Sequence, residues 1–144
     1  MASTPNRPQI PADMREFNKQ LITEMRANHG KLTSGPMAGR EPLLLTTIGT
    51  MTSEQRTVVL GFRRDGEDYL VIASNNGNDA EPYWFRNLKA RPRATVEVGP
   101  EKFEVRWRVA GAGERPRLSR LIDYFERQQA LTSRQIPIVV LERV

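Results

Sequence analysis

The sequence has no cysteine and a single histidine, His29. The lack of cysteine excludes disulfides, thiolate zinc sites and a cysteine nucleophile, and one histidine cannot build a histidine-rich metal centre. A Ser–His triad is disfavoured for the same reason, and we place His29 at the end of a helix. Long apolar runs are also missing, so we expect no signal peptide, no membrane span and a cytoplasmic compartment. We expect no metal site.

Neither positive nor negative charge is concentrated in any one part of the chain. Lysine and arginine number 22 against 17 aspartate and glutamate, which gives a net charge of +5 and a pI of about 10.1. The basic residues are interleaved with acidic ones, and no basic run resembles a nucleic-acid-binding arm. The excess charge therefore fits a small anionic ligand at least as well as DNA or RNA. A nucleic-acid binder that uses the face of Arg106 and Arg108 is the least favoured function.

With 144 residues the chain is long enough for one domain with its own core. We predict a polar, proline-bearing tail at residues 1–12 and a single domain at residues 13–144. The apolar spacing predicts a helix that begins at Asp13 and ends in a left-handed cap at Gly30. A second helix is predicted over residues 114–128.

Six segments have the composition or the alternation of strands. They are residues 43–49, 57–63, 69–73, 94–98, 102–110 and 136–142. Asp65-Gly66 predicts a tight hairpin, and Pro137 places the last strand at a sheet edge or marks a strand start. The hairpins, with helices at the start, near the C-terminus and in one crossover, predict an α+β fold: an antiparallel barrel or strongly curled sheet flanked by helices.

We expect the rest of the chain to be organised around the segment of residues 69–92. An apolar strand leads into a polar loop at residues 74–79, and Pro82 opens a short helix. Such a connection leaves backbone N–H groups free beside a helix N-terminus, whose partial positive charge suits a phosphate or the edge of a flavin-like ring. An ordinary strand-to-helix connection explains the same pattern, and local chemistry alone favours that interpretation.

Several short motifs of the chain are specific as a set, although each one alone is weak. They are Leu45-Thr46-Thr47-Ile48-Gly49, Ala73-Ser74, Pro82-Tyr83-Trp84, Asn87-Leu88-Lys89-Ala90 before Pro92, and Ile136-Pro137-Ile138-Val139-Val140. In this combination the chain resembles the deazaflavin (coenzyme F420)-dependent nitroreductase family. The similarity covers nearly everything after the tail.

The resemblance implies an antiparallel split β-barrel of the FMN-binding type, usually a homodimer, with F420 in a groove beside the barrel. The cofactor carries the hydride chemistry, and the protein binds and orients it. The implied function is an F420-dependent oxidoreductase that passes a hydride from reduced deazaflavin to an electron-poor acceptor such as an activated alkene, a quinone or a nitro compound. An FMN-binding oxidoreductase and a non-catalytic ligand-binding relative are the alternatives.

The resemblance also carries the family's site positions onto this chain. Those near the phosphate and acidic tail of F420 are Thr50, Met51, Thr52 and Arg56. Those that frame the ring are Thr57, Val58, Val59, Leu60, Gly61, Ile72, Ala73, Ser74 and Asn75. Those at the helix start beneath the ring are Tyr83, Trp84, Phe85, Arg86 and Asn87. Phe125 falls on the substrate side, and the candidates for a general acid are Tyr83 and Tyr124.

The turn at residues 50–52 departs from the family, which usually has two cations there. Arg56 is retained, and Arg40, Arg63 and Arg64 are neighbouring arginines that could supply the missing charge. FMN has a single phosphate and would need fewer cations than the acidic tail of F420.

Overall fold

The structure is a computed structural model that describes residues 14–33, 35, 38–50 and 52–144. The predicted tail, the predicted cap at Asp13 and the predicted site residue Met51 lie outside the described residues. The elements follow in the order α1 (Met14–Ala27), β1 (Leu43–Ile48), β2 (Gln55–Leu60), β3 (Arg63–Asp65), β4 (Asp68–Ile72), the 3₁₀ turn η1 (Asn75–Gly77), α2 (Tyr83–Ala90), β5 (Ala94–Val98), β6 (Glu101–Val109), α3 (Arg115–Leu121), α4 (Phe125–Gln129) and β7 (Ile138–Arg143).

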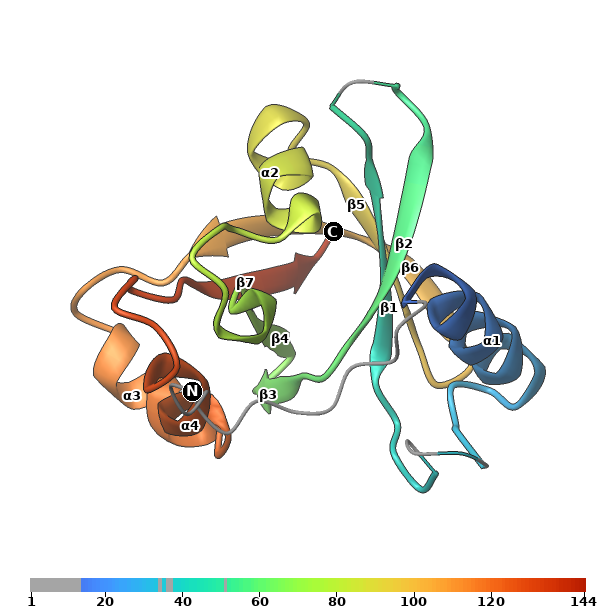
Figure 1. Cartoon of the computed structure of the whole chain (residues 1–144), viewed down its shortest axis with the longest axis horizontal. Helices are drawn as coiled ribbons and strands as arrows, with labels where there is room; N and C mark the ends of the chain where they lie inside the picture. The colour runs from blue at the N-terminus through green and yellow to red at the C-terminus, as the bar shows by residue number, and fades with distance from the viewer. Residues whose placement is uncertain (1–13, 34, 36–37, 51) are drawn as a thin grey trace, which may run out of the picture.

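The seven strands of the described chain form one sheet whose two edges are joined by a short piece of chain (Figure 1). The order is β2-β1-β5-β6-β7-β4-β3, and each neighbouring pair is antiparallel. β2 at one edge runs into β3 at the other through Gly61 and Phe62. A flat seven-stranded sheet would hold its edges about 29 Å apart at ~4.8 Å per strand, which two residues cannot span. The sheet therefore curls, and the predicted antiparallel split β-barrel with flanking helices is confirmed.

The single strand predicted over residues 57–63 is wrong, because the chain forms two strands there. β2 pairs with β1, whereas β3 pairs with β4 at the opposite edge. The apolar pattern continues through the bend, so it does not indicate that the two halves pair with different strands. The predicted hairpin is confirmed: Asp65 pairs with Asp68 across a two-residue turn in which Gly66 has a φ of 61°.

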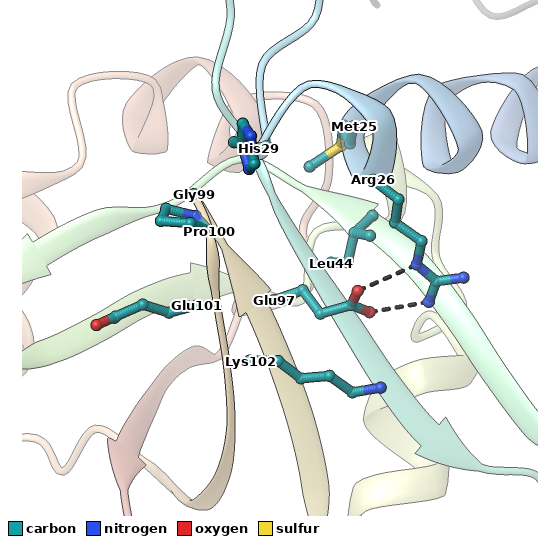
Figure 2. Close-up of a pocket in the computed structure, with 10 residues that line it drawn as sticks. Met25, Arg26, His29, Leu44, Glu97, Gly99, Pro100, Glu101 and Lys102 are labelled. Carbon is teal, nitrogen blue, oxygen red and sulfur yellow. Dashed lines mark hydrogen bonds and ion pairs between the residues drawn. The ribbon is translucent and has the colours of Figure 1, made fainter.

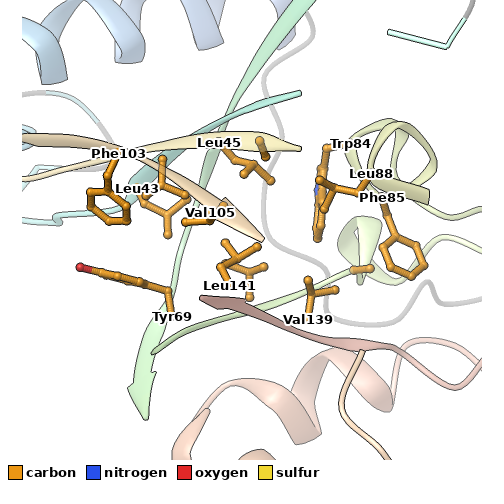
Figure 3. Close-up of a cluster of buried hydrophobic side chains, with 14 residues drawn as sticks. Leu43, Leu45, Tyr69, Trp84, Phe85, Leu88, Phe103, Val105, Val139 and Leu141 are labelled. Atoms are coloured by element: carbon orange, nitrogen blue, oxygen red, sulfur yellow. The ribbon is translucent and has the colours of Figure 1, made fainter. Parts of the chain in front are cut away.

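Apolar side chains from both halves of the sheet meet inside the curl (Figure 3). This interior cluster consists of Leu43, Leu45, Tyr69, Val71, Ala73, Trp84, Phe85, Leu88, Ala94, Val96, Phe103, Val105, Val139 and Leu141. Trp107 packs edge-on against Phe85, with 5.9 Å between the ring centroids. Trp107, which is partly buried, therefore faces the core.

The helices cover the outer side of the sheet in two places (Figure 1). α1 lies over β1 and β2, where Leu21 and Met25 are buried against Leu44. α3 and α4 lie over β4 and β7, where Leu118 and Phe125 are buried in a third cluster. No helix within the described ranges is both long enough and apolar enough to cross a membrane.

The one helix predicted over residues 114–128 is wrong, since α3 and α4 are separate helices. Ile122 ends α3 with an extended backbone (φ −107°, ψ 92°), and its side chain is 1% exposed. The bend brings Leu118, Ile122 and Phe125 into one cluster. Leu121, by contrast, is 40% exposed. Tertiary packing here outweighs helix propensity.

Two prolines mark the starts of elements. Pro82 is the N-cap of α2, one position before the first turn in which it was predicted. Pro137 directly precedes β7, which lies between β6 and β4. The strand-start alternative for Pro137 is confirmed, and the edge alternative is wrong.

α1 is fixed to the sheet at its C-terminal end. Arg26 donates two hydrogen bonds, of 3.0 and 2.9 Å, to the carboxylate of Glu97 on β5. Gly30 then turns the chain with a φ of 88°, and a Cβ there would lie 2.7 Å from the backbone N of Gly99. The predicted left-handed cap is confirmed. The hydrogen bonds from Arg26 hold the pKa of Glu97 below its ordinary value of 4.5.

This ion pair predicts how the stability of the protein changes with pH. A lowered carboxyl pKa stabilises the fold above pH 4.5, and that stabilisation is lost as the pH falls through the lowered pKa. At neutral pH we expect Glu97→Gln to lower the free energy of unfolding by ~0.5–1 kcal/mol, since Arg26 is half exposed. Urea unfolding at a series of pH values should show a shallower acid decline in this variant than in the wild type.

Glu101→Gln is the matched control, because Glu101 forms a more exposed ion pair with Arg143. It should leave the acid decline unchanged. Parallel pH curves for the wild type and Glu97→Gln would contradict the assignment.

Candidate functional site

The loop between β4 and α2 has an uncommon backbone conformation. Asn75, Asn76 and Gly77 have positive φ values of 48°, 54° and 77°. Asparagine adopts this region more readily than most non-glycine residues, but normally as a single residue, so the surrounding structure has to hold two in succession in place. Inside the loop, the N–H of Gly77 donates to Ser74 O at 3.0 Å and the N–H of Asn78 donates to Asn75 O at 3.1 Å.

Three backbone donors of this loop are free. Among the described residues, the N–H groups of Ser74, Asn75 and Asn76 have no hydrogen-bond acceptor. Ser74 is right-handed helical (φ −79°, ψ −31°) and Asn75 is left-handed. Successive residues of these two kinds turn their N–H groups into a shared concavity that binds anions or electron-rich atoms.

The outward face of α2 begins directly after this loop. Tyr83 is 80% exposed, and the guanidinium of Arg86 lies 5.6 Å from the centroid of its ring. The structure thus brings Tyr83 and Arg86 to the surface at the start of the helix. They are the two predicted helix positions that a ligand beside the loop can reach.

The other predicted positions of α2 point inward. Trp84 and Phe85 are buried in the interior cluster. Asn87 is buried as well, and its Nδ2 donates to Thr47 Oγ1 on β1 at 3.0 Å. These three side chains fix α2 to the barrel and so set the position of the loop in front of it.

The predicted ring residues of β2 divide between the two sides of the strand. Val58 and Leu60 pack against the interior cluster. Val59 packs toward α1 on the outer side. Thr57 shares a hydrogen bond of 2.8 Å with Thr46 on β1. Val58 and Leu60 are therefore the apolar side chains that this strand offers inside the curl.

Two predicted site residues are part of the core beneath α3 and α4. Ile72 and Phe125 are 8% and 4% exposed and belong to the same cluster. Ala73, the next residue after Ile72, is buried in the interior cluster instead. The structure does not bring Ile72 and Phe125 together with the free N–H groups of the loop.

Tyr124, rather than Phe125, lies beside the end of β2. A Cβ on Gly61 would be 3.6 Å from the Tyr124 hydroxyl. The guanidinium of Arg63 stacks 4.8 Å from the ring centroid and pairs with Asp123 at 2.6 Å. The hydroxyl is buried without a hydrogen-bond partner in the described chain. Burial raises the pKa of Tyr124, which keeps this phenol protonated at neutral pH.

The turn between β1 and β2 is hydrogen-bonded internally and exposed on its surface. The N–H of Gly49 donates to Glu54 O at 2.7 Å. Thr50 and Thr52 are exposed. Arg56 is 55% exposed and pairs with Glu54 at 3.2 Å. The predicted anionic anchor therefore stands beside the turn with its side chain accessible.

A second cation, which no sequence motif indicated, reaches this turn. Arg91, the C-cap of α2, donates from Nη2 to Ser53 Oγ at 2.9 Å. The arginines considered from the sequence lie elsewhere: Arg63 and Arg64 stack on tyrosine rings, and Arg40 is exposed on the loop before β1. The role of Arg91 follows from the tertiary fold, so no local pattern could have found it.

A pocket also lies between the end of α1 and the β5–β6 hairpin (Figure 2). The Arg26–Glu97 pair, His29, Gly99 and Lys102 line it. Its volume is about 130 Å³, well below the roughly 300–1,000 Å³ of sites that enclose organic ligands. It is too small for a deazaflavin. Within the described ranges, no three His, Asp or Glu side chains form a group that could hold a metal ion.

Comparisons with known proteins agree on one family. The sequence matches the family described as F420H(2)-dependent quinone reductase over residues 16–143. An F420H(2)-dependent quinone reductase of Mycobacterium tuberculosis is 38% identical over 124 aligned residues, which cover 77% of this chain and 83% of the relative.

Two solved structures are similar to this chain, and the first of them is an F420-dependent reductase. An F420-H2 dependent reductase, FDR-A, has a TM-score of 0.63 and 27% identity over 72% of this chain and 95% of that chain. A second structure, described as a domain-swapped dimer, has a TM-score of 0.65 and 25% identity over 86% of this chain and 96% of that one. The resemblance that the sequence motifs indicated is confirmed, and the chain belongs to the family of F420H(2)-dependent quinone reductases.

Proposed function

We propose that this protein uses reduced F420 to reduce quinones. The observation that carries the proposal is the row of free N–H groups at Ser74, Asn75 and Asn76, held beside α2 in a chain of this family. Reduced F420 supplies a hydride and a proton, which together convert a quinone into its hydroquinone. The task of the protein is to bind the cofactor, orient it and leave room for the acceptor.

The loop donors suit the polar edge of the deazaflavin ring. Backbone N–H groups fixed by the fold need no side-chain ordering when a ligand binds, so they orient a planar heterocycle at little entropic cost. Val58 and Leu60 of β2 are only partly buried where they pack against the interior cluster, so they leave apolar surface accessible. Donors on one element and apolar side chains on another match a ring that is polar at its edge and apolar on its faces.

Arg56 and Arg91 would hold the phosphate and the acidic tail of F420. They reach the same turn from different elements, Arg56 from β2 and Arg91 from the end of α2. The guanidinium fork is suited to both phosphate and carboxylate. Together the two side chains provide the positive charge that residues 50–52 of the turn lack.

The acceptor would approach from the exposed side of α2. Tyr83 is the exposed aromatic residue at the start of that helix, and its ring offers a stacking surface for a quinone. The Tyr124 hydroxyl is enclosed, so we assign it to the support of β2 rather than to proton transfer. Water on the exposed side can deliver any proton that the cofactor does not.

We further propose a homodimer in the cytoplasm. The relative with 25% identity that is described as a domain-swapped dimer supports the dimer. The lack of cysteine fits a reducing compartment. Light scattering on the purified protein should give twice the chain mass of 16.4 kDa, and a molar mass equal to that of one chain would contradict the proposed dimer.

Binding of F420 and FMN, measured in parallel by fluorescence, tests the proposed function. We expect F420 to bind more tightly than FMN. Arg56→Ala and Arg91→Ala should each raise the Kd for F420 about tenfold or more, because each removes a charged hydrogen bond that contributes ~1.5–3 kcal/mol. Reduced F420 should then be oxidised when menadione is added to the complex.

Arg120→Ala is the control for these variants, since Arg120 is exposed on α3. It should bind F420 as the wild type does. Tight binding of FMN without binding of F420 would contradict the cofactor assignment. If reduced F420 binds but no quinone oxidises it, the protein is a binding protein and not a reductase.

A further inference from the structure

Arg134, between α4 and β7, joins the two ends of the loop that carries the free donors. Its Nη2 donates to the backbone oxygens of Ala73, Ser74 and Asn78 at 3.1, 3.0 and 3.3 Å. Its Nε donates to Asn78 O at 3.4 Å. One guanidinium therefore contacts Ala73 just before the loop, Ser74 at its start and Asn78 just after its left-handed residues.

These contacts set the direction of the free N–H groups. In a planar trans peptide the carbonyl and the following N–H point in opposite directions. The carbonyls of Ala73 and Ser74 face Arg134, so the N–H groups of Ser74 and Asn75 point away from it. These are two of the three free donors, which means that Arg134 fixes the orientation of the site's donors from behind.

Arg134 is itself held in place. Gln129 Nε2 donates to Arg134 O at 2.7 Å, and the N–H of Arg134 donates to Thr132 Oγ1 at 3.1 Å. Its Nη1 is buried, without an acceptor in the described residues, and its contacts to Ala73 and Ser74 are partly buried, whereas those to Asn78 are exposed. The hydrogen bonds to Ala73 and Ser74 are therefore partly shielded from water. Nearby, a Cβ on Gly77 would lie 2.4 Å from Leu131 Cβ, which shows how closely this segment supports the loop.

We infer that Arg134 is a positioning residue for the redox cofactor. It acts through the backbone of residues 73–78 and does not contact the ring. A lysine cannot replace it, because its flexible stem lacks the second donor, Nε, that contacts Asn78 O and the rigid plane that keeps Nη2 between the two ends of the loop. Without these contacts, the unfavourable left-handed residues Asn75 and Asn76 would relax and turn their donors away. The inference rests on the proposed function, in which these donors face the cofactor.

The test compares Arg134→Ala and Arg134→Lys with Arg127→Ala, an exposed arginine of α4 that serves as the matched control. Three kinds of measurement are made: F420 binding for the Kd, steady-state kinetics with menadione for kcat and KM, and NMR of the Ser74 and Asn75 amides without cofactor. Arg134→Ala should raise the Kd and lower kcat roughly tenfold or more. Guanidinium ion below denaturing concentrations should restore both in a saturable way.

Arg134→Lys should lose F420 affinity and should not respond to guanidinium, because the lysine occupies the space. Both Arg134 variants should shift the two amide signals, whereas Arg127→Ala should change none of these quantities. Two results would overturn the inference. One is wild-type F420 affinity in Arg134→Ala. The other is a loss of F420 affinity that guanidinium fails to restore, although the variant unfolds at the wild-type temperature. If Arg134→Ala does not fold, wild-type affinity in Arg134→Lys overturns it.

Failure of the proposed function gives a different result. A wild-type protein that binds no F420 would overturn the function. The amide signals alone would then decide whether Arg134 positions the loop. Shifted Ser74 and Asn75 signals in Arg134→Lys would support this role, and unshifted signals would overturn it.

Discussion

Two residues, Gly61 and Phe62, join the opposite edges of the sheet, and this connection constrains the rest of the fold. Because the edges cannot separate, the strands enclose an interior filled by the side chains of Figure 3. The outer side must then be covered separately, by α1 at one place and by α3 with α4 at another. The loop between β4 and α2 is held between the interior and the segment that follows α4.

The candidate site is built mainly from backbone groups that distant side chains hold in place. Asn87 ties α2 to β1 through Thr47, and Arg134 ties the loop to the segment before β7. The groups that would meet a cofactor are N–H groups of the loop and the two arginines at the β1–β2 turn. This arrangement explains how the site can keep its form although the turn itself lacks cations.

Features that depend on local sequence were predictable. The alternation and flanking turns located β5 to the residue, and the apolar strand followed by a polar loop and Pro82 located the free donors. Features that depend on what a segment packs or pairs with could not be predicted. Examples are the break between β2 and β3 and the break between α3 and α4. Arg91 and Arg134 act on residues 38 and 61 positions away, and no local pattern encodes such contacts.

A crystal structure with bound F420 tests the central claim most directly, namely that the backbone of the β4–α2 loop orients the ring. The account predicts ring-edge atoms within hydrogen-bonding distance of the N–H groups of Ser74, Asn75 or Asn76, with the anionic tail at the turn that Arg56 and Arg91 share. A cofactor seated in the pocket beside His29 and Gly99, or one whose ring lies away from the loop, would contradict it.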